Sequence, residues 1–192
     1  MEFLSMGLFE GIREMPNIHP LIVHFPIALF SVFLLAEFIN FFINSEGLRS
    51  AASYTLYLGT LAAVATVLAG WSAESTITHS EAVHSIMESH EALGITVLVI
   101  GIVLSVWRLR RGRKFSPIER LVHLFLAFAA VVVLSMGADL GGLMVYKYGV
   151  GVKAVKVEGR HDHSGSHDSD RVPINSIEEN HSAGAHAHGH KD

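Results

Sequence analysis

Four long stretches of apolar residues, separated by short polar segments, form the main pattern along this chain. They cover approximately residues 21–43, 51–71, 92–107 and 118–138. A helix needs about 20 mostly apolar residues to cross the hydrocarbon core, where each backbone donor must be satisfied within the helix. The pattern therefore predicts an all-α fold, a polytopic membrane four-helix bundle.

The two ends of the chain differ from these stretches. Residues 1–20 mix charged side chains with loosely spaced apolar ones, which predicts an N-terminal interfacial segment before a transmembrane domain over residues 21–153. Residues 154–192 are rich in Asp, Ser, His and Gly and contain few large apolar side chains, so we expect a disordered His-rich C-terminal tail. No internal repeat is apparent beyond this local bias toward histidine.

Composition supports the membrane class and excludes several chemistries. Half of the 192 residues are apolar and only 17% are charged, too few to solvate an ordinary soluble domain. The chain has no cysteine, which excludes disulfides, thiolate ligands and thiol nucleophiles. A net charge of -4 indicates no nucleic-acid surface. No phosphate-binding loop or hydrolase motif occurs, so the sequence carries no catalytic signature and favours electron transfer over substrate catalysis.

A dense basic run connects the third and fourth apolar stretches and contains Arg108, Arg110, Arg111, Arg113 and Lys114. Short loops with such an excess of Lys and Arg stay in the cytoplasm. We therefore expect a bacterial cytoplasmic (inner) membrane protein with its N- and C-termini on the outer side. The polar segment at 72–91 would also lie on that side.

This topology gathers several histidines at the outer face. His24 lies about one turn inside the first predicted span, and His90 enters the third at a similar depth when that span is extended back over residues 87–91. Two imidazoles at equal depth on neighbouring helices are what a bis-histidine haem b site requires. We therefore predict His24 and His90 as axial ligands, with His19 and His84 as substitutes. The predicted function is an outer-side electron carrier in the lipid bilayer, working with a quinone pool or a cytochrome partner.

Two alternatives stay open. A divalent metal ion such as zinc, copper or nickel could bind the same cluster, joined by His79 and Asp139 and supplied by the tail. The tail histidines that would collect this metal are His161, His163, His167, His181, His186, His188 and His190. The other alternative is a cofactor-free accessory subunit of a homo- or hetero-oligomer, with solvated histidines and the small residues of the second span as its partner-binding face.

Three polar positions near the cytoplasmic face are interpreted as interfacial. Glu37 and Asn40 share a helix face and are expected to extend toward the headgroups, and His123 is read as an interface residue. The glycine-rich segment 140–152 follows the fourth span. We interpret this segment as a re-entrant or surface-lying cap over the histidines, or as a simple interfacial anchor.

Residues 18–29 read Ile-His-Pro-Leu-Ile-Val-His-Phe-Pro-Ile-Ala-Leu, which resembles the opening of the DUF2231 family of predicted bacterial membrane proteins. Two later stretches, 58–71 and 140–152, are also similar to that family. The resemblance implies a four-helix membrane domain without an established function, and it matches the family's histidines to His19, His24 and His90. Domains of this kind are sometimes joined to c-type cytochrome modules, which favours electron transfer.

Overall fold

The computed structural model of the chain describes residues 9–74, 81–112 and 114–152. The chain divides into two compact units, residues 1–155 and 156–192, and all described residues belong to the first unit. The predicted interfacial segment is described only from residue 9 onward. The His-rich tail and His79 lie outside the described residues.

Six helices follow one another in the described part of the chain. They are α1 (Glu10–Glu14), α2 (His19–Ile22), α3 (His24–Ile43), α4 (Glu46–Glu74), α5 (Glu81–Arg111) and α6 (Pro117–Tyr148). With α2 and α3 counted as one segment, His19–Ile43, four helical segments are long and apolar enough to cross a membrane. The predicted all-α, four-helix membrane fold is therefore confirmed.

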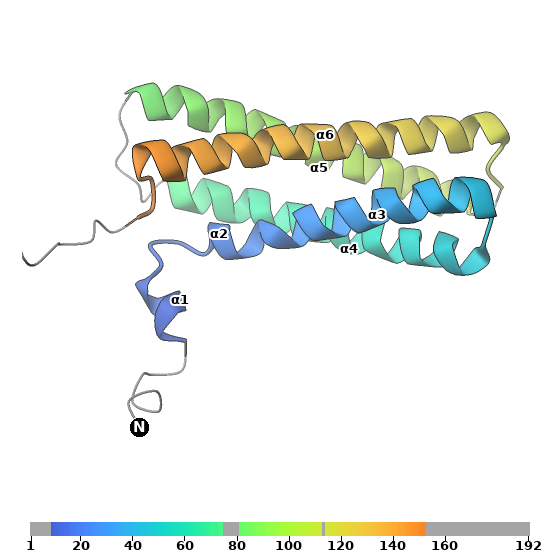
Figure 1. Cartoon of the computed structure of the whole chain (residues 1–192), viewed down its shortest axis with the longest axis horizontal. Coiled ribbons are helices and arrows are strands. Elements are labelled where there is room, and N and C mark those ends of the chain that lie inside the picture. The colour runs from blue at the N-terminus through green and yellow to red at the C-terminus, as the bar shows by residue number, and fades with distance from the viewer. Residues whose placement is uncertain (1–8, 75–80, 113, 153–192) are drawn as a thin grey trace, which may run out of the picture. The chain divides into compact units, whose positions relative to one another are not determined.

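The four long helices form a closed ring in which each packs against two neighbours: α3 contacts α4 and α6, and α5 contacts the same two helices. Figure 1 shows these helices side by side, with the α3–α4 and α5–α6 connections at the same end. We call this end the arginine end, because it holds Arg49, Arg108 and Arg120. The opposite end, which holds His19 and His90, is the histidine end.

Local caps rather than hydropathy set where these helices stop. Ser116 and Glu119 form a capping box at the start of α6, and Gly149, in the left-handed region with φ 65°, ends it. The interpretation of residues 140–152 as a re-entrant or surface-lying cap is wrong, because α6 continues to Tyr148 with Met144 buried. Likewise, α4 continues to Glu74 and α5 begins at Glu81, so both helices include part of the polar segment that was expected between them.

The core is densely packed between the two ends. Phe30, Phe33, Leu56 and Leu104 are completely buried, while the outward faces of the long helices expose large apolar side chains, as expected for contact with lipid. The Phe30 ring lies where a side chain on Gly101 would be, because a Cβ added there would come within 2.9 Å of Phe30 Cζ. Close approach of this kind is how small residues stabilise helix pairs in a membrane.

The two helix hairpins, α3–α4 and α5–α6, match one another at a constant offset of 71 residues. Several buried positions correspond in this register: Phe33 with Leu104, Ala52 with His123, Leu56 with Ala127, and Gly59 with Ala130. The same offset joins several identical residues, among them His19 with His90, Ser45 with Ser116, Arg49 with Arg120, and Gly70 with Gly141. The bundle is therefore an approximate twofold repeat of one hairpin, which the sequence analysis did not recognise.

Candidate functional site

Two histidines face each other at the histidine end. The ring centroids of His19, at the start of α2, and His90, in α5, are 6.1 Å apart, and the ring planes are inclined by 79°. Both side chains are partly buried. Trp71 of α4 donates a hydrogen bond to the Glu91 carboxylate beside His90, which ties the two hairpins together at this level.

Each of these histidines is held in the same way by a neighbouring helix. His19 Nδ1 lies 3.1 Å from the Thr66 carbonyl oxygen, and His90 Nδ1 lies 2.8 Å from the Gly137 carbonyl oxygen. In both cases the acceptor follows its histidine by 47 residues. Because a carbonyl oxygen only accepts, each Nδ1 must carry the proton, which leaves the lone pair of a neutral ring on Nε2.

A glycine makes each of these contacts possible. Gly70 lies one turn after Thr66, and Gly141 lies one turn after Gly137. A Cβ added at Gly70 or Gly141 would lie 3.4 or 3.3 Å from Cε1 of the respective histidine. Because glycine has no side chain, the imidazole can approach the neighbouring helix closely and can bond to one of its backbone carbonyl oxygens. The arrangement fixes both the ring orientation and the tautomer.

The other predicted ligands lie elsewhere. His24 is exposed on α3, so the ring brought next to His90 is that of His19, the predicted substitute. His84 is half exposed, and its Nε2 lies 3.4 Å from the Glu88 carboxylate one turn away. Asp139 is exposed on α6. Within the described ranges, no group of three His, Asp or Glu side chains is placed to hold a metal ion.

Sequence reasoning missed a second polar cluster, which lies inside the arginine end. Glu37 and Arg108 form a buried ion pair, with Oε1 2.6 Å from Nη1 and side chains only 12% and 7% exposed. Arg108 also donates to Ser53 Oγ at 2.8 Å and to the Arg49 carbonyl oxygen at 3.0 Å. The interpretation of Glu37 as a side chain that extends to the headgroups is therefore wrong. The interpretation of Arg108 as a topology signal is incomplete, because its side chain also pairs with Glu37 inside the bundle.

His123 completes this cluster from α6. It is 1% exposed, and its Nδ1 lies 3.5 Å from Glu37 Oε2. Edge contacts with the rings of Phe33, Trp107 and Phe115, at centroid distances of 5.4–5.9 Å, enclose it. The interpretation of His123 as an interface residue is wrong, because its helical phase turns it into the bundle rather than toward the membrane surface.

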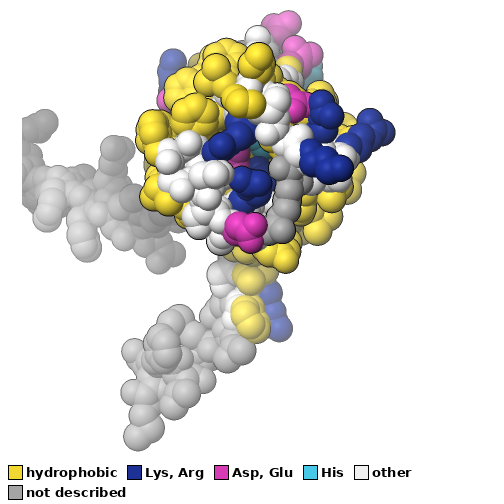
Figure 2. All heavy atoms as spheres, turned by 90° about the vertical axis from the view of Figure 1, so that its right-hand side faces the viewer, with side chains coloured by type: hydrophobic (Ala, Val, Ile, Leu, Met, Phe, Trp, Pro, Cys, Tyr) yellow, Lys and Arg dark blue, Asp and Glu magenta, His cyan; other side chains and the backbone are white. Residues whose placement is uncertain are grey.

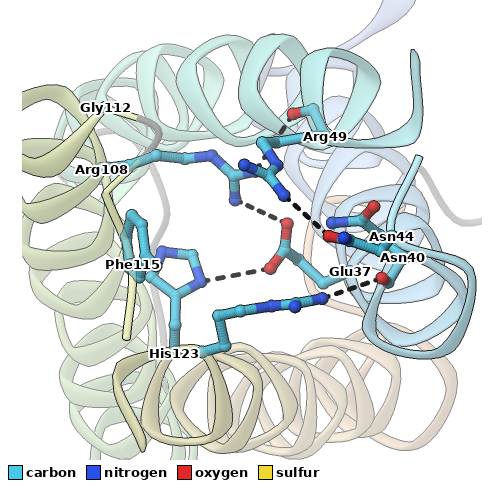
Figure 3. A pocket seen from close by; sticks show the side chains of 9 residues that line it. Glu37, Asn40, Asn44, Arg49, Arg108, Gly112, Phe115 and His123 are labelled. Atoms are coloured by element: carbon cyan, nitrogen blue, oxygen red, sulfur yellow. Dashed lines mark hydrogen bonds and ion pairs between the residues drawn. The ribbon is translucent and has the colours of Figure 1, made fainter. Parts of the chain in front are cut away.

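A cavity of about 250 Å³ opens onto these residues. Its lining is polar and includes Glu37, Asn40, Asn44, Arg49, Arg108, Gly112, Phe115, Arg120 and His123. Figure 2 looks onto this end and shows basic side chains around a central hollow, with an apolar rim outside them. Figure 3 shows the Glu37 carboxylate between Arg108 and His123 within the ring of helices.

One signal in the sequence could have found this cluster. Glu37 and Arg108 are 71 residues apart, and so are Arg49 and Arg120. Once the repeat is recognised, opposite charges at equivalent positions of two neighbouring hairpins predict an ion pair across the approximate twofold axis. A hydropathy profile cannot show this ion pair, because it treats each charged residue only as the polar end of its own membrane span.

Comparisons with known proteins agree with this architecture. No curated protein and no solved structure matches the chain. Residues 15–154 match the family described as "Predicted membrane protein (DUF2231)", so the match includes every long helix and both polar clusters. The chain therefore belongs to the DUF2231 family of predicted membrane proteins.

Proposed function

We propose that this protein is a membrane electron carrier in which His19 and His90 would hold one haem b. The observation that carries the proposal is the pair of facing imidazoles, each with Nδ1 bonded to a backbone carbonyl of the adjacent helix. An outer-shell hydrogen bond of this type is the usual partner of a metal-bound histidine, because it orients the ring and makes Nε2 a better donor.

The separation of the two ring centroids is close to the value that two imidazoles sharing one iron atom would have. A metal held between two imidazole nitrogens, each bonded at about 2.0 Å, separates the ring centroids by about 6 Å. The observed separation is 6.1 Å. Gly94 lies one turn after His90 on the same face of α5, and a Cβ added there would meet no atom within 4 Å. Open space beside a ligand is what a porphyrin edge requires.

The bound group would supply reversible one-electron chemistry, and the protein would position and tune it. Helices α2 and α5 would hold the ligands, while α4 and α6 would fix their orientation through Thr66 and Gly137. We further propose that the histidine end faces the outer side of a bacterial inner membrane, which follows from the basic run at the opposite end. Its partners would be the quinone pool and an outer cytochrome.

An optical spectrum of the full-length protein, purified in detergent and measured air-oxidised and dithionite-reduced, tests the proposal. The expected result is a Soret band and a reduced alpha band with about one iron per chain. His19→Ala and His90→Ala should each abolish the six-coordinate spectrum. His24→Ala and His84→Ala are matched controls and should retain it, because both side chains are exposed.

Metal analysis of the same samples separates the remaining outcomes. Bound zinc or copper without a Soret band would contradict the haem assignment and favour metal handling, with a metal content that falls in the variants of His19 and His90. Neither haem nor metal would favour a cofactor-free accessory subunit. A spectrum that survives His90→Ala but is lost in His24→Ala would overturn the assignment of His19 and His90 as the ligand pair.

A further inference from the structure

The cavity at the arginine end lies far along the bundle from the histidine pair and has no role in the proposed electron transfer. We infer that it is an anion site that takes a phosphate group, held between Arg49 of α4 and Arg120 of α6. Both arginines line the cavity, and they occupy equivalent positions in the two hairpins. The approximate twofold repeat thus brings two guanidinium groups to one cavity from opposite helices.

The charge balance inside the cavity favours an anion. Three arginines line it, with Glu37 as the one acidic side chain among its lining residues. The Glu37 carboxylate is already paired with Arg108 at 2.6 Å, and the nitrogens of Arg108 are further occupied by Ser53 and Arg49. The positive charges of Arg49 and Arg120 therefore remain without an acidic partner among the lining residues.

Both remaining guanidinium groups keep donors for a ligand. Arg49 uses Nη2 to donate to Asn44 Oδ1 at 3.0 Å, and Arg120 uses Nη2 to donate to the Asn40 carbonyl oxygen at 3.0 Å. A guanidinium has five N–H donors, so these anchors position each group without using all of its donors, although Arg120 also lies over the Phe41 ring at 5.8 Å. Planar guanidinium forks are well suited to phosphate oxygens.

A second, independent observation points to a ligand in the same place. The side-chain oxygen of Asn40 and the Nε2 atom of His123 are buried without a hydrogen-bond partner among the described residues, and both side chains line the cavity, whereas His123 Nδ1 faces the Glu37 carboxylate at 3.5 Å. Asn40 is 5% exposed and His123 is 1% exposed. Buried polar atoms are normally satisfied, because leaving one unpaired costs about 1–3 kcal/mol. Water molecules held with a bound phosphate would donate to Asn40 Oδ1 and would bond to His123 Nε2.

The phosphate group has two possible sources that share this chemistry. Free phosphate, or a soluble phosphorylated compound, would enter from water at the end of the bundle that Figure 2 faces. An anionic phospholipid would instead bring its headgroup from the surrounding bilayer. Both would be held by the same two arginines, so the experiment must separate them.

Ligand-dependent stability of the full-length protein in detergent is the measurement. Thermal unfolding is followed at increasing inorganic phosphate, with chloride at equal ionic strength as the reference, and again after addition of phosphatidylglycerol or phosphatidylcholine. A ligand that binds only the folded state raises the unfolding temperature in a saturable manner. Arg49→Gln and Arg120→Gln should each weaken the apparent affinity at least tenfold. Arg110→Gln should leave it unchanged, since this exposed arginine does not line the cavity.

The outcomes distinguish the sources and can overturn the inference. Saturable stabilisation by inorganic phosphate that depends on Arg49 identifies a site for a free phosphate group. Stabilisation by phosphatidylglycerol but not phosphatidylcholine, with the same dependence and without a phosphate effect, identifies a lipid headgroup. Because Arg120→Gln also removes a bond to the end of α3 and could impair folding, Arg120→Lys and Arg49→Lys serve as folded variants that keep charge but lose the fork. No response to either ligand, or equal responses in Arg49→Gln and wild type, overturns the proposal.

Discussion

Neutralising one partner of the Glu37–Arg108 pair should destabilise the bundle far more than neutralising both. The two side chains are 12% and 7% exposed and bonded at 2.6 Å, so either charge alone would be left in a poorly solvated interior. Removing one member of a buried pair costs about 3–5 kcal/mol, whereas replacing both is often close to neutral. Arg108→Gln also loses two bonds, to Ser53 Oγ and the Arg49 carbonyl. We therefore expect Arg108→Gln to cost more than Glu37→Gln, at about 4 against about 3 kcal/mol.

A double-mutant cycle isolates the interaction between the two charges. Glu37→Gln with Arg108→Gln should be at least about 2 kcal/mol more stable than the sum of the single changes, within the range measured for directly contacting residues. Unfolding by a denaturing detergent can be followed through tryptophan fluorescence, because Trp107 lies against His123 in this cluster with 5.9 Å between ring centroids. Arg110→Gln, which removes an exposed charge from the same basic run, should change the free energy of unfolding by less than about 0.5 kcal/mol.

Additive single effects would refute the reasoning, since they would mean that Glu37 and Arg108 are stabilised independently by water or by other groups. Single effects no larger than that of Arg110→Gln would refute it more directly. Either result would mean that the pair is solvated and that the attraction between Glu37 and Arg108 does not stabilise the bundle at the arginine end.

Two further predictions concern close helix packing and the histidine pair. Gly101→Ala should destabilise the protein by about 1–3 kcal/mol in the same unfolding assay, because the added methyl group would meet Phe30 Cζ at 2.9 Å and Thr60 Oγ1 at 3.0 Å. Gly94→Ala is its control, and in open space it should be neutral or stabilising by up to about 1 kcal/mol; equal effects would contradict this packing. Gly141→Val should displace the His90 ring and so reduce the content of the proposed haem or shift its spectrum. Gly142→Val is its control and should do neither, because a Cβ at Gly142 would lie 3.9 Å from its nearest neighbour. Loss of haem in both variants would argue against a specific role for Gly141.

The number of long helices was predictable because it depends only on runs of apolar residues that the bilayer requires. Their lengths were less predictable. The helices continue through charged residues at the arginine end, such as Glu46 and Arg111, because backbone bonding and caps rather than hydropathy decide where a helix ends. The same limit explains the error in the segment before Gly149, where glycines in α6 serve close packing and the turn comes only after Tyr148.

At the histidine end, sequence reasoning favoured His24 as the neighbour of His90, whereas the structure brings His19 next to it. His19 and His24 are five residues apart, which in a helix turns their side chains by roughly 140° relative to each other, so they cannot both face the same neighbour. Sequence alone did not decide which of them faces the bundle, because the chain changes helical segment at Val23 between two prolines. The decisive features were Thr66 and Gly70 on another helix, which become informative only when α2 and α4 are placed together.

The arginine end was not predicted because each of its charges has an ordinary explanation within its own helix. Arg108 looks like part of a basic connection, Glu37 like a side chain that extends to the headgroups, and His123 like an interface residue. Their partnership is a property of three helices at once. A buried charge can be recognised only when its partner is known and when the face of the helix on which it lies is known. A hydropathy average does not distinguish the faces of a helix.

The approximate repeat links the two ends of the bundle physically. One hairpin, used twice, places each feature at two equivalent positions around a common axis, so side chains near that axis necessarily meet their counterparts. Where the counterparts are identical, as with His19 and His90, the result is a pair of facing imidazole rings. Where they have changed to opposite charges, as with Glu37 and Arg108, they neutralise each other. Arg49 and Arg120 have kept the same charge at the same end, and two like charges held beside one cavity are most stable when an anion lies between them. The twofold arrangement thus gives one physical reason for both proposals, the haem site at the histidine end and the phosphate site at the arginine end.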